Sequence, residues 1–404
     1  MRSSRTRRRI SVRTAAATAV AVLVPFALTA CSSGSDSADG KGTVKDGGKP
    51  ATVAVTPTGS GAKAGQPVQV TASGGTLTSV SVTDGSTAKP LAGTLSKGGT
   101  VWTSDRKALP GKTYKVTAET KGAGGAKGTQ QASFSTARAA KKNKLELWPT
   151  AKTVGVAHPV SIVFDEPVAN KAEVERQLKV TASTKTEGSW GWMKHYDGRD
   201  RVDWRPREYW KPGTQVRLQA LLNGTDSGAR GGFFAKDYDK SFTVGAHQEV
   251  KVDLDAKRLA FERAGKPTRT IPISGGDPAP GADKRSWSGT SVLMAKAGTI
   301  RMTSQSVGLG DAYDKMVDYS MHLTYSGAYA HAAPWNAAYF GKANKSSGCI
   351  GMSTANASSF YQDVQVGDPF TVTGKDAKSK APLGNGYSNW NLSWQEWQKL
   401  SALS

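Results

Sequence analysis

Residues 250–274 read VKVDLDAKRLAFERAGKPTRTIPIS, and this stretch decides the fold of the C-terminal part of the chain. Apolar and polar side chains alternate in three short runs, which is the pattern of strands that bury one face. Tight polar turns at 255–257 and 264–266 separate the runs, so consecutive strands form hairpins. We therefore predict a β-rich domain over residues 247–374. Its inward-facing side chains are Val250, Val252, Leu254, Leu259, Phe261, Ile271 and Ile273.

Helical signals are few downstream of these strands. Ser353 is placed to cap a helix that runs to about Asp363, ahead of Gly367 and the strand sequence FTVTG. Residues 375–404 follow as a tryptophan-rich tail. An aromatic stripe at helical spacing predicts a short helical tail that packs against the rest of the protein. The stripe consists of Trp390, Trp394, Trp397 and Leu400.

An internal repeat occupies the region upstream. The segments VTPTGSGAKAGQPVQV and LWPTAKTVGVAHPVSI each hold two prolines ten residues apart, and LPGKTYKVTA matches KPGTQVRLQA. Short alternating segments in each copy are interrupted by Gly, Pro and Asp, which is typical of antiparallel sandwiches of about a hundred residues. The repeat predicts two immunoglobulin-like β-sandwich domains, over 50–137 and 144–246, with a hinge at 138–144. The predicted fold class is therefore mainly β.

Residues 1–30 have the form of a bacterial export signal. Six arginines precede an apolar run that ends in Leu-Thr-Ala before Cys31, and the run is too short and too alanine-rich for a good membrane-spanning helix. Small residues before a cysteine resemble a lipobox, in which the cysteine is diacylated and becomes the first residue. An ordinary secretory signal with an incidental cysteine is the alternative. Both Sec and twin-arginine export stay open. Residues 31–49 form a flexible tether.

The formal net charge of +22 bears on the partners of the protein. The six arginines of the signal account for six of these charges, leaving +16 for the mature chain. Such a charge ordinarily favours nucleic acid, but export excludes it and leaves anionic wall polymers or lipid head groups. A basic surface without a specific partner is the alternative. The five histidines have no metal-ligand spacing, so we predict neither a metal nor a cofactor. We expect a lipid-anchored protein outside the membrane that faces the cell wall.

Cys349 is the one cysteine that is left if Cys31 carries lipid. In an oxidising space an unpaired thiol is either a buried spectator or a nucleophile. His331 lies eighteen residues upstream, and an imidazole can take the thiol proton and leave an ion pair. The neighbouring glycine exposes backbone amides that could form an oxyanion hole, an effect typically worth about 3 kcal/mol per donor. Spacing alone does not establish the pair.

The residues around this pair resemble the L,D-transpeptidase (YkuD) family. The family signature is a histidine, a gap, and Ser/Thr-His-Gly-Cys followed by an apolar residue and Asn or Arg. Here YSGAYAHAAPWN is followed by SSGCIG. The resemblance covers about 248–374. With the two sandwich domains, the stretch LELWPT…FDEPV…VDWRPREYWKPGT and the tryptophan-rich tail, the chain is similar to the actinobacterial multidomain lipoproteins of this family.

The resemblance implies an enzyme that cross-links peptidoglycan stem peptides. Cys349 would attack the carbonyl of the third, diamino-acid residue of a donor tetrapeptide and expel D-alanine. The amine of a neighbouring stem would then resolve the thioester to a 3→3 cross-link. His331 would act as base and then as acid, oriented by the backbone carbonyl of Ala332, and carbapenems would acylate the same thiol. The other implied site residues are Tyr313 on the substrate lid, Gly348 in the oxyanion hole with the Cys349 amide, and Ser346 and Ser347 beside them.

Two positions depart from the family signature. Ser347 stands where the family has His, and Gly351 stands where it has Asn or Arg. The base is the upstream His331, so neither change removes the essential pair. A serine cannot carry positive charge, which predicts a thiol pKa above that of relatives and a slower enzyme. His322 is an additional imidazole that strand alternation would turn elsewhere, and Trp335 is expected to anchor its loop.

Two other functions stay open on these residues. A non-catalytic wall-binding lipoprotein would keep the fold without turnover. An L,D-carboxypeptidase would use water in place of the acceptor amine, with the same Cys349 and His331. The sequence also leaves open the acceptor, the type of diamino acid and the oligomeric state.

Overall fold

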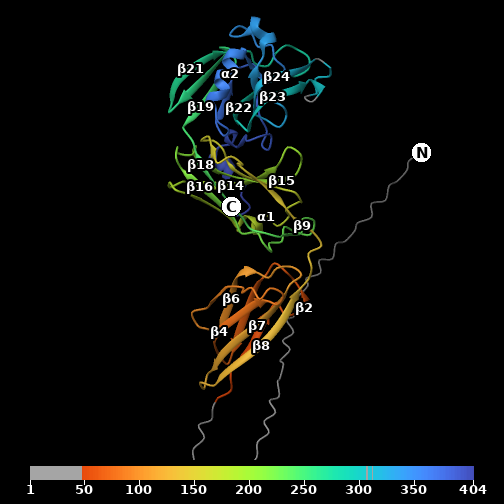
Figure 1. Cartoon of the computed structure of the whole chain (residues 1–404), viewed down its shortest axis with the longest axis vertical. Helices are drawn as coiled ribbons and strands as arrows, with labels where there is room; N and C mark the ends of the chain where they lie inside the picture. The colour runs from red at the N-terminus through yellow and green to blue at the C-terminus, as the bar shows by residue number, and fades with distance from the viewer. Residues whose placement is uncertain (1–47, 306–307, 312) are drawn as a thin grey trace, which may run out of the picture. The chain divides into compact units, whose positions relative to one another are not determined.

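The structure is a computed structural model that describes residues 48–404 apart from 306, 307 and 312. The predicted export signal, Cys31 and nearly all of the tether therefore lie outside the described residues. Within them the chain is mainly β, as predicted, and its strands fall into three successive groups (Figure 1). No helix in the described part of the chain is long and apolar enough to cross a membrane.

The first group of strands forms a sandwich of two four-stranded sheets, with the orders β1-β3-β6-β5 and β2-β8-β7-β4. In its core Tyr114 stacks on Phe134 with ring centroids 5.1 Å apart, and Trp102 belongs to the same cluster. This is an immunoglobulin-like fold of the predicted kind. The strands are β1 Thr52–Thr56, β2 Gly59–Ala62, β3 Pro67–Ser73, β4 Gly75–Asp84, β5 Gly93–Leu95, β6 Val101–Lys107, β7 Thr113–Gly122 and β8 Lys127–Thr136.

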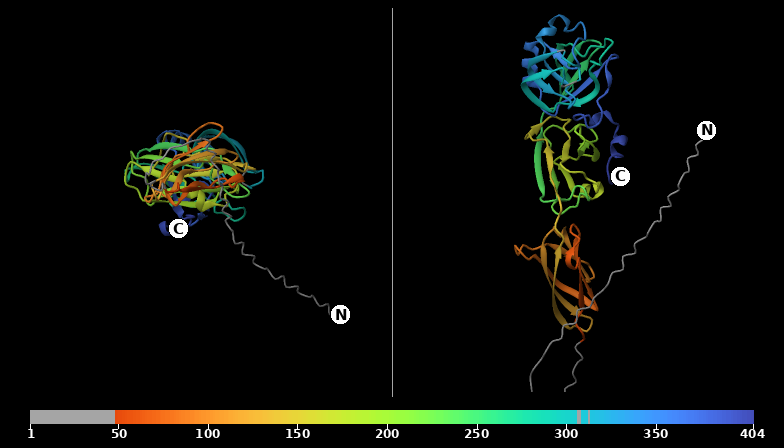
Figure 2. Two further views of the ribbon diagram at one scale, coloured as in Figure 1. Left: turned by 90° about the horizontal axis from the view of Figure 1, so that it is seen from below. Right: turned by 90° about the vertical axis from the view of Figure 1, so that its right-hand side faces the viewer.

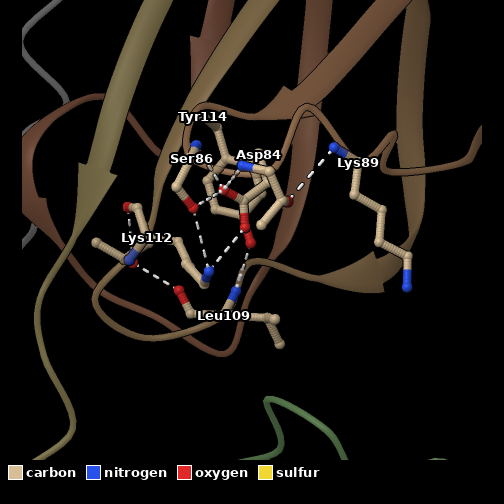
Figure 3. Close-up of polar contacts among 8 residues, drawn as sticks. Asp84, Ser86, Lys89, Leu109, Lys112 and Tyr114 are labelled. Atoms are coloured by element: carbon tan, nitrogen blue, oxygen red, sulfur yellow. Dashed lines mark hydrogen bonds and ion pairs between the residues drawn. The ribbon is translucent and has the colours of Figure 1, made fainter.

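A polar cluster holds the turn that follows β4 (Figure 3). Asp84 accepts hydrogen bonds from the Ser86 N–H at 2.8 Å and the Ser86 hydroxyl at 2.6 Å, and it pairs with the Lys112 ammonium at 3.0 Å. The Ser86 hydrogen bond, helped by Lys112, holds the pKa of Asp84 well below its usual range. Nearby, the Leu109 N–H donates to the Tyr114 hydroxyl at 2.8 Å. Hydrogen bonds therefore fix this end of the domain.

The second group of strands repeats the sandwich with a larger aromatic core. Its sheets have the orders β10-β12-β15-β14 and β11-β18-β16-β13, and β9 pairs with β17 beside them. Trp204 stacks on Trp210 at 5.1 Å, and Phe164 stacks on Trp192 at 5.5 Å. The elements are β9 Lys142–Asn143, β10 Leu145–Trp148, β11 Thr153–Val154, β12 Val160–Phe164, α1 Lys171–Glu175, β13 Leu178–Ala182, β14 Gly188–Lys194, β15 Asp200–Pro206, β16 Gln215–Ala220, β17 Phe233–Phe234 and β18 Tyr238–Val244.

The C-terminal domain contains a six-stranded sheet of order β21-β20-β19-β27-β22-β28 and a four-stranded sheet of order β23-β24-β25-β26. Both predicted hairpins are present, and all seven predicted inward side chains are buried. The tight turns use left-handed backbone at Lys257 (φ 52°), Ala264 (φ 49°) and Gly265 (φ 76°). The strands are β19 Gln248–Asp253, β20 Arg258–Arg263, β21 Lys266–Pro272, β22 Trp287–Val292, β23 Ala295–Thr303, β24 Asp314–His322, β25 Tyr329–Ala332, β26 Ile350–Met352, β27 Pro369–Thr373 and β28 Lys378–Lys380.

The predicted helix is α2, which spans Thr354–Asp363. The Ser353 side chain caps it by accepting from the Asn356 N–H, as the sequence indicated. Phe360 is fully buried on the inner face of the helix and packs edge-on against Phe261 at 5.7 Å. The cap and this one apolar face place the helix against the sheets. A short 3-10 helix, η2, covers Pro334–Tyr339.

The C-terminal tail packs as predicted, but it is not one continuous helix. The 3-10 helix η3 (Asn389–Asn391) and α3 (Trp394–Gln398) are separated by Leu392, whose backbone is extended. Trp397 is fully buried, and its indole N–H donates to the Ser189 carbonyl in β14 at 3.0 Å. The dark-blue end of the chain in Figure 2 lies against the yellow-green strands accordingly. The tail therefore packs on the second domain.

A buried polar junction joins the second domain to the C-terminal domain. The Gly155 N–H donates to the Val366 carbonyl at 2.7 Å. Arg201 of β15 is fully buried, where it pairs with Asp203 at 2.5 Å and donates to the Gly386 carbonyl at 3.0 Å. A buried ion pair requires such additional hydrogen bonds to offset its desolvation. The junction therefore depends on the tail as well as on both domains.

Candidate active site

The parallel pairing of β25 with β26 brings the candidate cysteine and histidine together. His331 in β25 pairs with Gly351 in β26. Cys349 immediately precedes β26 and lies two residues before Gly351. The pairing therefore places Cys349, just before β26, next to the strand that carries His331, although eighteen residues separate the two in the sequence.

His331 is held in one tautomer. It is 5% exposed, and its Nδ1 lies 2.7 Å from the Ala332 carbonyl oxygen. A carbonyl oxygen only accepts, so Nδ1 carries the hydrogen and donates it. Burial lowers the pKa of His331, which keeps the ring neutral at neutral pH. The imidazole therefore has Nε2 as an unprotonated base, with the Ala332 contact that the family resemblance implied.

Cys349 is an unpaired, partly exposed cysteine whose thiol donates to the Gly327 carbonyl at 3.7 Å. Burial of the sulfur raises the pKa of Cys349 to about 11. The pKa shifts of Cys349 and His331 both favour the uncharged forms of the two groups. They do not favour the ion pair expected from the sequence.

The loop before the cysteine is fixed by two serines. The Ser346 hydroxyl donates to the Cys349 carbonyl at 2.6 Å and accepts from the Gly348 N–H at 3.2 Å. Ser286 donates from the other side to the Gly348 carbonyl at 2.9 Å. Gly348 has a φ of +116°, a conformation that favours glycine. The sequence pattern SSGC therefore describes a hydrogen-bonded loop in which the Gly348 amide already has a partner.

Tyr313 immediately precedes β24 and interacts electrostatically with Cys349. Its N–H donates to the Ser304 hydroxyl and its carbonyl accepts from the Ser304 N–H, both at 3.0 Å, which closes the segment between β23 and β24. Burial raises the pKa of Tyr313, and the charge of a Cys349 thiolate raises it further. The phenol is therefore within electrostatic reach of the sulfur. The residues 306, 307 and 312 of this segment are outside the described part.

Tyr329 is a site residue that sequence reasoning missed. Its pKa is raised by burial and then by the Cys349 charge, so it too lies near the sulfur. It stands two residues before His331 in β25, and this spacing was the signal that could have identified it. Its ring stacks at 4.4 Å on His322, whose Nε2 donates to the Thr324 carbonyl at 2.7 Å. Among the described residues no three His, Cys, Asp or Glu side chains are grouped as metal ligands.

Two further residues near the site, Trp335 and Gly351, differ from the loop anchor and from the family signature residue expected at their positions. Trp335 was expected to anchor a loop, but it is 42% exposed and its ring centroid lies 6.0 Å from that of His331. The Trp335 ring covers the His331 imidazole instead of anchoring the loop. A Cβ atom at Gly351 would lie 2.9 Å from the Ala333 Cβ, closer than carbon atoms pack. The Asn or Arg of the family signature therefore does not fit this backbone.

Ser347 lines a cavity of about 340 Å³ beside the nucleophile. Its hydroxyl stands where the family signature places an imidazole, and Gly327 and Gly348 line the same cavity. Position 347 therefore offers no cation to lower the pKa of Cys349, which burial of the sulfur raises.

Comparison with known proteins agrees with this geometry. The model of the L,D-transpeptidase catalytic domain (YkuD) matches residues 247–372, and that of a bacterial Ig domain matches 59–226. The chain is 31% identical over 358 residues to L,D-transpeptidase 2 of Mycobacterium tuberculosis (strain CDC 1551 / Oshkosh), covering 87% of this chain and 84% of that protein. It is 34% identical over 227 residues to L,D-transpeptidase 1 of the H37Rv strain, covering 55% of this chain and 80% of that protein.

A solved structure of the LD transpeptidase LdtMt1 in complex with imipenem is also similar. It has 30% identity and a TM-score of 0.48, and it covers 58% of this chain and 99% of that one. The match to L,D-transpeptidase 2 extends over both sandwich domains as well as the domain that holds Cys349 and His331. The chain therefore belongs to the L,D-transpeptidase family.

Proposed function

We propose that this protein is a peptidoglycan L,D-transpeptidase that forms 3→3 cross-links by acyl transfer through Cys349. One observation carries the proposal. The parallel pairing of β25 with β26 brings Cys349 next to the strand that carries His331, and the hydrogen bond from His331 Nδ1 to the Ala332 carbonyl leaves Nε2 as the base. Membership of the family supports the choice of substrate.

The first half-reaction forms a thioester. As Cys349 Sγ attacks the carbonyl carbon of the third residue of a donor tetrapeptide, its proton passes to His331 Nε2. The C–N bond to D-alanine then breaks, and Nε2 returns the proton to the departing amine. The raised pKa of Cys349 favours this concerted transfer, because it disfavours a thiolate before substrate binds.

The second half-reaction transfers the acyl group to an amine of a neighbouring stem. The amine nitrogen attacks the thioester carbon and loses a proton to His331 Nε2. The C–S bond breaks as the new amide forms, and the proton returns to Cys349 Sγ. The imidazole is neutral at the start of each half, which is the state that burial favours.

Backbone amides stabilise the oxyanion in both halves. The Cys349 N–H is the first donor, because the Gly348 N–H already donates to Ser346 in the resting loop. The Gly348 amide joins when it turns from the Ser346 hydroxyl to the substrate oxygen. One such donor is typically worth about 3 kcal/mol. Tyr313 and Tyr329 lie within electrostatic reach of the sulfur.

The proposal includes a location and a class of inhibitor. Lipid on Cys31 would anchor the chain outside the membrane, facing the wall, and the basic surface would face anionic wall polymers. Carbapenems present a reactive carbonyl that the same thiol can attack. Cys31→Ala should move the protein from the membrane fraction to the soluble fraction, and retention with the membrane would contradict the anchor.

The test of the activity uses the purified chain and a disaccharide tetrapeptide. Mass spectrometry should show one D-alanine released for each dimer formed, and an adduct on Cys349 after brief exposure to meropenem. Cys349→Ala should give neither product. His331→Gln should slow acylation by about 10²–10⁴-fold. His322→Gln is the matched imidazole control and should stay near wild type, since His322 donates to the Thr324 carbonyl.

Three other outcomes have distinct meanings. Release of D-alanine without dimer would identify an L,D-carboxypeptidase. Absence of any Cys349 adduct, with either the stem or meropenem, would leave a wall-binding protein of the same fold. Near-normal acylation in the His331→Gln variant would assign the base to another group.

A further inference from the structure

The cavity beside the nucleophile has walls from two domains. The C-terminal domain supplies Ser347, Gly348 and Gly327, and the Gly327 carbonyl accepts from the Cys349 thiol. The second immunoglobulin-like domain supplies Tyr196. A side chain of the second immunoglobulin-like domain, which holds neither Cys349 nor His331, therefore faces the space next to the candidate nucleophile.

Tyr196 is held in an ordered turn between β14 and β15. The His195 N–H donates to the Arg199 carbonyl, and the Gly198 N–H donates to the His195 carbonyl, both at 2.9 Å. The ring of Tyr196 stacks on Tyr325 of the C-terminal domain, with centroids 6.3 Å apart and 23° between the planes. Tyr196 is nevertheless 58% exposed. One part of the ring is therefore fixed by the protein and the rest is open to a ligand.

The strands that carry this turn are tied to the tail. Arg201 of β15 is buried and donates to the Gly386 carbonyl at 3.0 Å. The Trp192 N–H of β14 donates to the Leu400 carbonyl at 2.9 Å. Because the turn rests on two anchored strands, Tyr196 is positioned before a ligand arrives. Such preorganisation lowers the entropy cost of binding.

The charged side chains of the cavity favour an anion. Lys378 and Arg285 contribute two cations, and Asp283 contributes one carboxylate, which Arg285 engages at 2.8 Å. The Lys378 ammonium lies 4.4 Å from the Trp287 ring centroid, forms no salt bridge within the described residues and interacts electrostatically with Asp283. Because Asp283 is already paired with Arg285, an ammonium beside an aromatic surface suits a peptide that ends in a carboxylate. Peptidoglycan stems have this chemistry, because each free C-terminus is a carboxylate.

We propose that this cavity binds the carboxylate end of a peptide stem, with Lys378 as its ionic partner and Tyr196 as the wall on which the stem packs. The inference rests on the proposed function and deepens it. The second immunoglobulin-like domain is then part of the substrate site rather than a spacer. Tyr196 determines specificity and is not a catalytic residue, because bonds are made and broken at Cys349 and His331.

The experiment compares Tyr196→Ala, Tyr196→Phe and Lys378→Gln in the full chain, with donor tetrapeptide and acceptor stem varied separately. Tyr196→Ala and Lys378→Gln should raise the KM for one stem about tenfold at unchanged kcat, as expected when uniform binding is lost. Tyr196→Phe keeps the ring and should stay near wild type. Leu221→Ala removes a side chain that is 45% exposed on the same domain and serves as the matched control. A rise in the donor KM assigns the cavity to the donor, and a rise in the acceptor KM assigns it to the acceptor.

Alkylation of Cys349 by iodoacetamide supplies a second readout, because this small reagent needs the thiol but not the cavity. Its rate should be unchanged in Tyr196→Ala and Lys378→Gln. Wild-type KM values for both stems in these variants, or a parallel loss of alkylation, would overturn the inference. Failure of the wild-type protein to form any acyl adduct would instead contradict the proposed function, so the two failures are distinguishable.

Discussion

The two immunoglobulin-like domains share a fold but differ in what their equivalent strands bury. β6 of the first domain and β15 of the second occupy the same place in their sheets. β6 mixes buried residues with partly or fully exposed ones, whereas every residue of β15 is buried. A sandwich strand normally has one face toward water. In the second domain the tail and the C-terminal domain cover that face.

Burial of this face by the tail and the C-terminal domain changes which side chains β15 can hold. Trp102 and Trp204 face the cores of their own domains in the same way. On the other face of β15, Arg201 pairs with Asp203, and Arg205 lies 4.7–5.4 Å from the ring centroids of three tail tryptophans. Buried cations are tolerated only with such partners. The first domain therefore keeps the ordinary sandwich surface, and the second has become a scaffold for the candidate active site.

Removal of one buried charge in β15 should have the largest effect on stability. Asp203→Ala leaves the Arg201 cation buried without its carboxylate, and we expect a loss of about 3–5 kcal/mol in the free energy of unfolding of the second and C-terminal domains. Urea unfolding measures it. Asp239→Ala is the control in the same domain, because its pair with Arg217 is exposed, and it should have little effect. Equal losses of unfolding free energy in Asp203→Ala and Asp239→Ala would contradict the importance of burial by the tail and the C-terminal domain.

A buried carboxyl at the junction should make stability depend on pH. Burial raises the pKa of Asp368 to about 7, and a Cβ at Gly155 of the second domain would touch its Oδ1. In the unfolded chain the Asp368 carboxyl has a pKa near 3.8. The stability that the protonated carboxyl contributes is therefore fully present below that pH and is lost as the pH rises through about 7, by up to roughly 4 kcal/mol.

Asp368→Asn should flatten this dependence. The measurement is the urea midpoint of the second and C-terminal domains at intervals from pH 4 to pH 8 in both proteins. A wild-type midpoint that does not change with pH would show that Asp368 is not protonated in the folded state.

A smaller effect is expected at the link between the tail and the second domain. Glu175 is buried and accepts from the Trp192 indole N–H at 2.7 Å, the Ala402 N–H at 2.8 Å and the Ser401 hydroxyl. Glu175→Gln replaces one accepting oxygen with a donor, which should cost about 1–3 kcal/mol. Urea unfolding followed by tryptophan fluorescence measures this cost. Glu187→Gln, at an exposed position, is the control, and a similar cost there would contradict the link.

The smallest expected effect belongs to the first domain. Asp84 has a lowered pKa, so its contribution is present above the unfolded value and lost as the pH falls, the opposite sign to Asp368. Asp84→Asn should cost at most about 1 kcal/mol, because the pair with Lys112 is near the surface. Hydrogen exchange of β4 and β7 reports it. A change in the exchange of β15 would show that the two domains are not independent.

Local patterns predicted much of the fold. The alternation over 248–274, the turns at Lys257 and Gly265 and the Ser353 cap each act over a few residues, so they can be read without a partner segment. The structure of the C-terminal tail was harder to predict from sequence. Its tryptophans have helical spacing, but the helical backbone is interrupted at Leu392, and Trp397 and Trp390 contact β14 and β15.

Some features of the candidate site were likewise predictable from local sequence, and others depended on tertiary contacts. The sequence by itself indicated the candidate chemistry, because the SSGC motif and the upstream His331 stand in the order in which the family places a nucleophile and a base. Only the tertiary structure decided that β25 pairs with β26 in parallel, that Tyr329 lies within electrostatic reach of the sulfur and that Tyr196 lines the neighbouring cavity from another domain. The tertiary structure also decided the direction of the pKa shifts. Desolvation depends on atoms that lie far apart in the sequence, and it favours the neutral forms of both the Cys349 thiol and the His331 imidazole.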